Sequence, residues 1–215
     1  MTVVLGLLTM MQSRAQSEIG TLMLMPKVGA AWTTMAADGI YYGVESNEEA
    51  SAKGKFGFVG GVEAEYQLLD KLSLSAGVLY ARQGTAYEDV PKTWKDYKVS
   101  LDYLDIPILA HLYVAPNLAV QLGVQPGFLI HQRQSGEAFL YKNDGAELGW
   151  QSFSENTTYH RTFDFGIPIG ISYDFDSWRI ECRYCLGLYD TTKYKLKERN
   201  RSLQLTVGYR FTLWQ

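Results

Sequence analysis

The C-terminal stretch Ser202-Leu-Gln-Leu-Thr-Val-Gly-Tyr-Arg-Phe211 decides the fold of this chain. Its apolar or aromatic residues are Leu203, Leu205, Val207, Tyr209 and Phe211, and they alternate with Ser202, Gln204, Thr206, Gly208 and Arg210. Successive side chains of a β-strand point to opposite faces of the sheet. The stretch therefore predicts a strand with one apolar face and one polar or small face.

The same period of two runs through most of the chain after residue 20. It predicts seven further strands, near residues 22–34, 56–67, 72–84, 99–114, 118–132, 163–175 and 178–188. Each is about 10 residues long or longer, whereas strands of globular proteins have a mode of about 5–6 residues. A tilted transmembrane strand needs about 9–11 residues. The strand lengths therefore favour a barrel that crosses a membrane.

Short and long connections alternate between these strands. The short ones are residues 68–71, 115–117 and 175–177, and the long polar ones are residues 35–55, 85–98, 133–160 and 190–200. Outer-membrane barrels combine short periplasmic turns with longer outer loops. Residues 20–213 are therefore predicted to form an all-β fold, an eight-stranded antiparallel up-and-down transmembrane β-barrel. Its even strand number places both termini in the periplasm.

The second face of the strands indicates which side faces the lumen. It is rich in Gly, Ala and Ser, and it also carries a set of charges, Lys27, Glu63, Glu65, Asp105, Asp164, Arg179, Glu181, Arg183 and Arg210. Eight strands leave an interior just wide enough for side chains to fill, and buried charges need partners. We expect these residues to form a paired charge cluster that closes the lumen. Two alternatives stay open, a narrow channel and a soluble lipocalin-like barrel with its apolar face turned inward.

Aromatic residues at the strand ends agree with a membrane-spanning barrel. Near the short turns lie Tyr66, Tyr173, Phe175, Trp178, Tyr209 and Phe211, and near the long loops lie Trp32, Tyr80, Tyr159 and Phe163. Two such belts are expected at the two membrane interfaces. Outer-membrane lipid is therefore an expected partner.

Composition and the N-terminus point to an exported protein. The chain has 215 residues, 20 basic and 23 acidic side chains and 47% hydrophobic residues, which excludes intrinsic disorder. This charge balance argues against a nucleic-acid partner. The apolar run at residues 3–11 precedes Ser13 and Ala15, and this pattern predicts a signal peptide over residues 1–15. The expected location is the cell outer membrane of a Gram-negative bacterium.

The chain resembles the PorT-like outer-membrane β-barrel domain proteins that are abundant in Bacteroidetes. The resemblance covers residues 20–213 and is carried by Leu101-Asp-Tyr-Leu-Asp-Ile-Pro-Ile108, Leu72-Ser-Leu-Ser-Ala-Gly-Val-Leu-Tyr80 with Gly84, Gly123-Val-Gln-Pro-Gly127, Gly166-Ile-Pro-Ile-Gly-Ile-Ser-Tyr173 and Gly208-Tyr-Arg-Phe211. It implies the fold and the location. It implies no activity.

Cys182 and Cys185 form a C-x-x-C pattern, but a redox or metal role is not expected. In a strand, residues i and i+3 face opposite sides and lie about 10 Å apart. A disulfide requires Cα atoms within about 7 Å. Cys182 is therefore predicted to face lipid and Cys185 the lumen, both reduced. No metal site and no cofactor are expected.

An enzyme is not expected, although one alternative of this class stays open. His111 is predicted in the lumen, and His131 and His160 near the outer rim with Asp164 nearby. Rim residues of this type serve in outer-membrane enzymes that act on lipid, and His160 with Asp164 would be the candidate pair. No catalytic motif supports this reading.

The longest loop carries aromatic residues among Gly, Asn and Glu, namely Phe139, Tyr141, Trp150, Phe153 and Tyr159. Exposed aromatic residues on a rigid scaffold often mark binding surfaces. Packing of this loop onto the barrel rim is the alternative. We expect a structural role or a loop-mediated interaction, and another envelope protein is the candidate partner.

Overall fold

The fold is all-β. The structure, a computed structural model, describes residues 17–36, 40–41, 49–50, 52–143, 145–193 and 199–215. Its strands are β1 (Leu22–Ala36), β2 (Ile40–Tyr41), β3 (Glu49–Ala50), β4 (Ala52–Lys53), β5 (Lys55–Leu69), β6 (Leu72–Tyr87), β7 (Trp94–Asp105), β8 (Ile108–Ala115), β9 (Leu118–Tyr141), β10 (Glu147–Asn156), β11 (Phe163–Phe175), β12 (Trp178–Gly187), β13 (Arg199–Tyr209) and β14 (Phe211–Trp214). None of the described residues belongs to a helix with the length and apolar character needed to cross a membrane. The predicted signal peptide falls on residues 1–15, outside the described residues, and stays a prediction.

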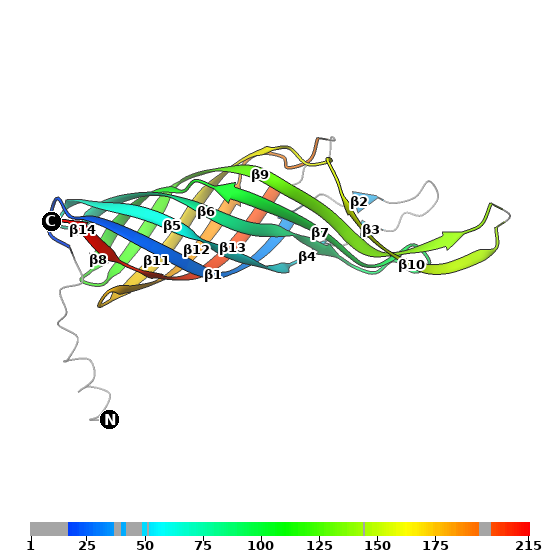
Figure 1. The fold of residues 1–215 in the computed structure, drawn as a ribbon, viewed down its shortest axis with the longest axis horizontal. Coiled ribbons are helices and arrows are strands. Elements are labelled where there is room, and N and C mark those ends of the chain that lie inside the picture. Colours follow the sequence, from blue (N-terminus) through cyan, green and yellow to red (C-terminus); the bar gives the residue numbers. More distant parts are fainter. Residues whose placement is uncertain (1–16, 37–39, 42–48, 51, 144, 194–198) are drawn as a thin grey trace, which may run out of the picture.

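The strands close into a ring of eight antiparallel staves in the described part of the chain. A stave here is one crossing of the barrel wall, so β7 and β8 together count as one stave. The order of the staves is β1, β5, β6, β7 with β8, β9, β11, β12 and β13, and β13 pairs back onto β1. The closing seam runs from Lys27 opposite Gly208 to Ala36 opposite Arg199. Figure 1 shows the tilted staves, with the C-terminus at the end that carries the short turns. We call this end the turn end and the opposite end the loop end. The predicted eight-stranded up-and-down barrel is confirmed.

The stave predicted at residues 99–114 consists of two strands, β7 and β8. They are separated at Ile106 and Pro107, where proline lacks the N–H that a ladder needs. The backbone stays bonded to both neighbouring staves, because Ile106 N donates to Pro126 O and Gly77 N donates to Pro107 O. The ring is therefore continuous across the interruption.

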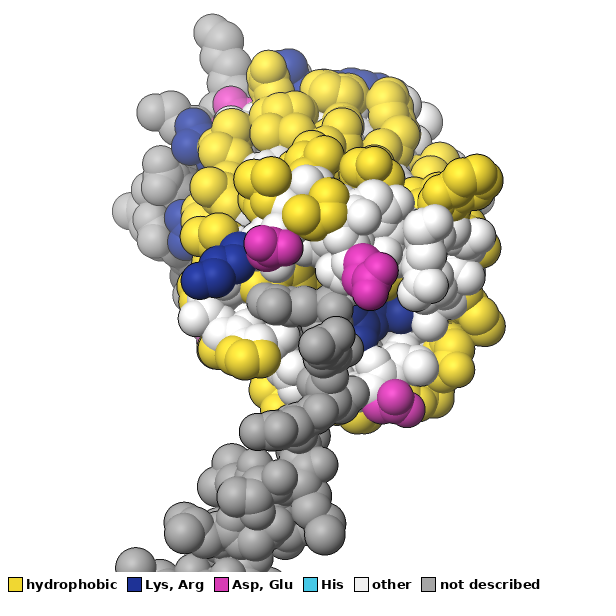
Figure 2. All heavy atoms as spheres, turned by 90° about the vertical axis from the view of Figure 1, so that its left-hand side faces the viewer, with side chains coloured by type: hydrophobic (Ala, Val, Ile, Leu, Met, Phe, Trp, Pro, Cys, Tyr) yellow, Lys and Arg dark blue, Asp and Glu magenta, His cyan; other side chains and the backbone are white. Residues whose placement is uncertain are grey.

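Side chains of β13 alternate between the outside and the inside of the barrel. Leu203, Leu205 and Val207 are 39–57% exposed, whereas Ser202, Gln204 and Thr206 are 2–5% exposed. The other staves follow the same rule, with outward apolar residues such as Val28 on β1 and Ile171 on β11. The apolar face thus points away from the lumen. Figure 2, a view of the turn end, shows hydrophobic side chains around the flank and charged side chains on the end face.

Aromatic side chains lie on the outside near both ends of the staves. Tyr66, Tyr173, Trp178 and Phe211 are exposed toward the turn end, and Trp32, Phe163 and Tyr159 are exposed toward the loop end. Phe175, Tyr209 and Tyr80 are half-buried. Trp178 packs edge-on against Tyr209, and Trp32 against Phe56. Amphipathic rings at two levels suit the two interfaces of a bilayer.

Residues 133–160, predicted as a polar loop, are largely strand. β9 continues to Tyr141, and β10 pairs with it as a hairpin from Glu147 opposite Tyr141 to Asn156 opposite Arg133. The first residues of β7 pair with the other edge of β9, including Trp94 opposite Ala138. This three-stranded sheet, which we call the outer sheet (residues 94–98, 133–141 and 147–156), projects beyond the ring at the right of Figure 1. Its alternating aromatic residues favour strand over loop, a signal that the Gly and Asn content of the segment concealed.

The closed ring predicts that the folded chain resists detergent. A ring has no free edge at which sodium dodecyl sulfate can separate the ladder, so the unboiled protein should migrate as a compact band. Boiling should convert it to a slower, extended form. A gel of the same refolded sample, boiled and unboiled, makes the measurement. Equal mobility in the two lanes would contradict the closed ring.

Candidate functional site

Strand β12 brings alternating charges into the lumen. Arg179, Glu181 and Arg183 are at most 3% exposed, because the period of two turns all three inward. The neighbouring β13 places Gly208 opposite Arg179 and Thr206 opposite Glu181. These small residues leave room inside the ring for the long charged side chains of β12.

Arg179 is the centre of an ion cluster near the turn end. Its guanidinium pairs with the carboxylates of Glu65 and Asp174, and its Nη2 lies 2.7 Å from Tyr113 Oη. Arg210 Nη1 lies 2.8 Å from Asp174 Oδ2, so two arginines share this acid. Hydrogen bonds to a charged partner are stronger than neutral ones, and this geometry fixes the Arg179 side chain across the lumen.

A second ion cluster lies one step closer to the loop end. Lys27 Nζ is 2.8 Å from Glu63 Oε2 and also pairs with Glu181. Arg183 Nη1 is 3.1 Å from Glu63 Oε1, and its Nη2 is 3.3 Å from Glu181 Oε2. Gln121 Nε2 donates to Glu181 Oε1 over 3.0 Å. Strands β1, β5, β9 and β12 are thus linked through one set of side chains.

Charges balance within these two clusters of the described residues. The cations are Lys27, Arg179, Arg183 and Arg210, and the carboxylates are Glu63, Glu65, Asp174 and Glu181. Four charges of each sign give a net charge of 4 − 4 = 0. Burying an unpaired ion costs several kcal/mol, and pairing offsets that cost. The two clusters form a neutral plug.

Asp105 and Asp164 differ from the expected arrangement, because the structure pairs neither with an arginine. Gln83 Nε2 donates to Asp105 Oδ2 over 3.1 Å, and Asn200 Nδ2 donates to Asp164 Oδ2 over 2.7 Å. Both acids line a small cavity nearer the loop end. Arg183 is not available to these two acids, because its guanidinium pairs with Glu63 and Glu181.

Some residues of the plug were missed in the sequence. Asp174 faces inward by the same alternation as Asp164, so parity alone identifies it. His111 lies in the lumen as predicted, and its Nε2 is 2.8 Å from Ser75 Oγ. Tyr113 and Gln121 are buried hydrogen-bonding partners of the charges that were not identified in the sequence. Their roles depend on the register between strands, which one sequence does not state.

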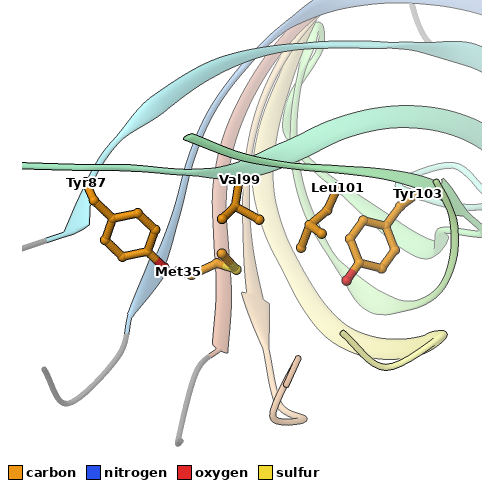
Figure 3. Close-up of a cluster of buried hydrophobic side chains, with 5 residues drawn as sticks. All are labelled: Met35, Tyr87, Val99, Leu101 and Tyr103. Carbon is orange, nitrogen blue, oxygen red and sulfur yellow. The ribbon is translucent and has the colours of Figure 1, made fainter. Parts of the chain in front are cut away.

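Part of the lumen near the loop end is apolar, a feature that was not predicted from the sequence. Met35 of β1, Tyr87 of β6 and Val99, Leu101 and Tyr103 of β7 form one buried cluster, which we call the apolar cluster. Figure 3 shows these five side chains pointing into the barrel. The inward-facing positions of β7 thus hold apolar residues, whereas those of the other staves hold mostly polar ones. Burial against each other removes these side chains from water at the barrel mouth.

Aromatic residues from the segment that was predicted as a loop contact one another on the outer sheet. The ring centroids of Phe139 and Trp150 lie 5.1 Å apart, as do those of Phe139 and Tyr141. Lys95 Nζ lies 4.3 Å from the Trp150 ring centroid. Phe153 packs on the opposite side, against Tyr97 of β7, and Tyr159 lies beyond the sheet with its side chain exposed. Phe139, Tyr141 and Trp150 thus pack on the outer sheet itself, whereas Phe153 is connected through Tyr97 to the apolar cluster at the barrel mouth.

The histidines are scattered, and no hydrogen bond in the described part of the chain joins His160 to Asp164. His111 lies in the lumen and His131 on the outside of β9. His160, between β10 and β11, is buried, and its Nδ1 lies 3.0 Å from Gln132 Oε1. Burial lowers the pKa of His160 to about 4, and the nearby Lys193 ammonium acts in the same direction.

The two cysteines are both free, as predicted. Cys182 lies on the outward side of β12 opposite Leu205, and Cys185 is buried in the lumen opposite Ser202. Within the described residues, no group of three or more His, Cys, Asp or Glu side chains is arranged to hold a metal ion.

Comparison with known proteins identifies the family. Residues 14–193 match the model of the outer membrane protein beta-barrel domain family, which includes every stave from β1 to β12. The chain belongs to this family. It is an outer-membrane β-barrel protein, and its outward apolar side chains form the surface that contacts lipid. A search of curated proteins gives no match.

Solved structures with a similar chain path are outer-membrane barrels. Ail of Yersinia pestis is 14% identical, with a TM-score of 0.48 over 90% of this chain and 100% of Ail. Neisserial surface protein A is 16% identical, with a TM-score of 0.48 over 87% of this chain and 97% of the other. OprG of Pseudomonas aeruginosa is 10% identical, with a TM-score of 0.46 over 93% and 99% of the two chains.

Removing Arg179 should destabilise the barrel strongly. The substitution Arg179→Ala leaves Glu65 and Asp174 buried with fewer counter-charges, and breaking such a pair costs about 3–5 kcal/mol. Glu147→Ala is the matched control, because Glu147 pairs with Lys92 while the two side chains are 53% and 67% exposed, and such pairs contribute about 1 kcal/mol or less. Urea unfolding in lipid vesicles measures both. Equal losses would contradict a stabilising plug.

Acid should loosen the segment that holds His160. Its pKa is about 4 in the folded state against 6.5 for a free side chain, so the opened segment binds more protons between these values. The stabilisation present above pH 6.5 is therefore lost as the pH falls toward 4. Hydrogen exchange at the His160 amide, which donates to Gln132, measures this opening. His160→Gln is the control, and the same pH dependence in both proteins would refute the prediction.

Proposed function

We propose that this outer-membrane barrel is a closed anchor that presents its outer sheet to another envelope protein outside the membrane. In this proposal both termini face the periplasm and the loop end faces outward. The observation that carries it is the combination of a filled lumen with a regular, aromatic-bearing sheet that projects beyond the ring. The barrel supplies rigidity, and the outer sheet supplies contact area.

The filled lumen supports an anchor over a channel. The neutral ion plug spans the turn-end half, and the apolar cluster lies nearer the loop end. An ion entering the lumen would have to displace paired side chains and then cross apolar ones, and both steps are costly. A narrow channel instead needs a continuous row of unpaired polar residues.

The orientation of the side chains favours an anchor over a soluble carrier. A lipocalin-like carrier needs an apolar cavity, whereas the apolar face of these staves points outward. A lipid-active enzyme is less well supported, because His160 bonds to Gln132 and Asp164 to Asn200. We propose that the protein has no catalytic activity.

The edge of the outer sheet suits a protein partner. Strand β10 pairs with β9 on one side, and its other edge has no neighbour among the described strands. Extended segments of partner proteins bind such edges by adding a strand, with side chains giving specificity. Trp150 on β10 and its cross-strand neighbour Phe139 on β9 provide aromatic side chains of the kind that is enriched in binding hot spots.

Within the family, we propose that the chain belongs to the PorT-like group found in Bacteroidetes. The support is the residue pattern of β7 and β8, in which Leu101 to Asp105 is followed by Pro107. In the fold this pattern forms the interrupted stave. The proposal assigns no pathway.

A closed lumen predicts the absence of ion current. The refolded protein, inserted into a planar bilayer in potassium chloride, should give no single-channel steps. The double variant Arg179→Ala, Arg183→Ala removes two side chains of the plug and is the comparison, provided that its gel shift shows a folded barrel. Stable current steps from the unmodified protein would overturn the closed anchor in favour of a channel.

Binding through the outer sheet predicts a position-dependent cross-link. A photoreactive residue in place of exposed Gln151 on β10 should form one discrete adduct with an envelope protein in intact cells. The same residue in place of Asp70, at the turn end, is the matched control. Adding Phe139→Ser and Trp150→Ser should abolish the adduct while the gel shift is kept. No adduct, or the same adduct at Asp70, would contradict the proposal.

A further inference from the structure

A small acidic cavity lies in the lumen between the neutral ion plug and the apolar cluster. Its walls include Gln83, Asp105, Gln125, Asp164 and Asn200, and its volume is about 10 Å³. On β13, Gln204 is opposite Arg183 of the plug, and Ser202, a cavity residue, is one inward position further along. On β7, Tyr103 of the apolar cluster is one inward position from Asp105. The cavity therefore has charged pairs on one side and apolar side chains on the other.

Strand register places the two carboxylates on either side of a glycine. Gly127 of β9 is opposite Asp105 of β7 and also opposite Asp164 of β11. Neighbouring strands lie about 4.8 Å apart, so the Cα atoms of the two acids are separated by about 10 Å with no side chain between them. A Cβ atom at Gly127 would lie 2.6 Å from Asp105 Oδ1. The Asp105 carboxylate thus leans over the glycine into the gap.

The two acids lack the counter-charges that every carboxylate of the plug has. In the described residues, neither Asp105 nor Asp164 has an ion pair, and their donors are neutral amides from Gln83, Asn200 and the Phe165 backbone. Asp105 is 3% exposed. A buried carboxylate without a counter-charge is strongly disfavoured. The level of the cavity is therefore short of positive charge.

Gln125 adds a third oxygen that has no donor. It is 4% exposed, it lines the cavity, and its Oε1 has no hydrogen-bond partner. Burying an acceptor without a partner costs about 1–3 kcal/mol. Gln125 is two residues from Gly127 on β9, so its side chain points into the lumen from the same face of the strand. An orphan amide oxygen beside two uncompensated carboxylates is the donor set of a cation.

We propose that this cavity binds one calcium ion through Asp105, Asp164 and the Gln125 amide oxygen. Carboxylate and amide oxygens are the ligands that calcium takes, and its flexible coordination suits donors from three different strands. Magnesium keeps several water molecules, and a cavity of about 10 Å³ holds about one. Two positive charges balance the two carboxylates. A thiolate-type metal is not favoured, since Cys185 is the one sulfur in the cavity wall.

The neutral plug and the apolar cluster on either side of the cavity predict slow exchange of this ion. The apolar cluster lies on the loop side and the neutral plug on the turn side, so the ion leaves through an opening of the barrel. A ligand that binds only the folded state stabilises it by mass action. Calcium should therefore raise the urea concentration at which the folded gel band disappears.

The experiment measures calcium binding to the refolded full chain in detergent. Equilibrium dialysis with radioactive calcium at pH 7 should give one ion per chain, and chelator should lower the urea midpoint. Asp105→Asn and Asp164→Asn should each weaken binding at least tenfold. Asp102→Asn is the matched control, because this acid lies on the same strand but pairs with Arg82, and it should bind within twofold of the unmodified chain.

A second set of variants keeps the test decisive if an Asp variant does not fold. Gln125→Leu keeps both carboxylates and removes the orphan oxygen, so it should fold and bind calcium more weakly. Terbium, a luminescent substitute for calcium, should be excited through Tyr103, which contacts Asn200. Tyr103→Phe should lower this emission and leave calcium binding unchanged.

Two results would overturn the proposal. Absence of saturable binding by the unmodified chain at millimolar calcium would mean that the acids are protonated or hold only water. Equal binding by the unmodified chain, Asp105→Asn and Asp164→Asn would place the ion on other acids. Neither result bears on the proposed contact with an envelope protein, because that contact is measured at the outer sheet.

Discussion

Pairing of β13 with β1 is the constraint on which the rest of the structure depends. Backbone groups exposed to hydrocarbon cost several kcal/mol each, so a sheet can cross a membrane only when its two edges meet. Closure at eight staves then fixes a narrow lumen. Side-chain size becomes critical inside it. At Gly208, for example, a Cβ atom would lie 2.7 Å from Met25 Cγ and 3.3 Å from Lys27 Cβ, so the glycine leaves space for the lysine that joins Glu63 to Glu181.

A lumen filled by side chains leaves little room for water to screen its charges, so the balance of positive and negative charge matters. Around Arg179 and Arg183 each cation meets at least one carboxylate, and the sum is zero. The level of Asp105 and Asp164 departs from that pattern, with amide donors in place of cations. Natural chains place few uncompensated acids in such surroundings without a use for them. This contrast between neighbouring levels of one lumen is the physical basis for assigning a cation to the cavity.

Alternation predicted the fold and the two faces of each strand, because parity along a strand needs only the sequence, and the small and charged residues of the second face indicated that it lines the lumen. Parity also predicted the positions of Cys182 and Cys185. It could not show that Asp105 and Asp164 flank Gly127, since the register of β11 against β9 is set across a connection that itself contains a strand. It also failed for β7, where Val99 and Leu101 face inward although apolar. Their burial depends on Met35 and Tyr87, which come from distant parts of the chain.

The length of β9 places the outer sheet beyond the membrane. β9 has 24 residues, roughly 80 Å at about 3.3 Å per residue, whereas the hydrocarbon core is about 30 Å thick. Even a strongly tilted strand therefore continues well outside the membrane. An ordered hairpin loses less conformational entropy on binding than a flexible loop does. An exposed strand edge is also a risk for aggregation, which the charges of Glu147 and Glu155 reduce on β10. In the proposed contact with an envelope protein, the rigid, aromatic-bearing extension offsets this risk by supplying a preorganised surface.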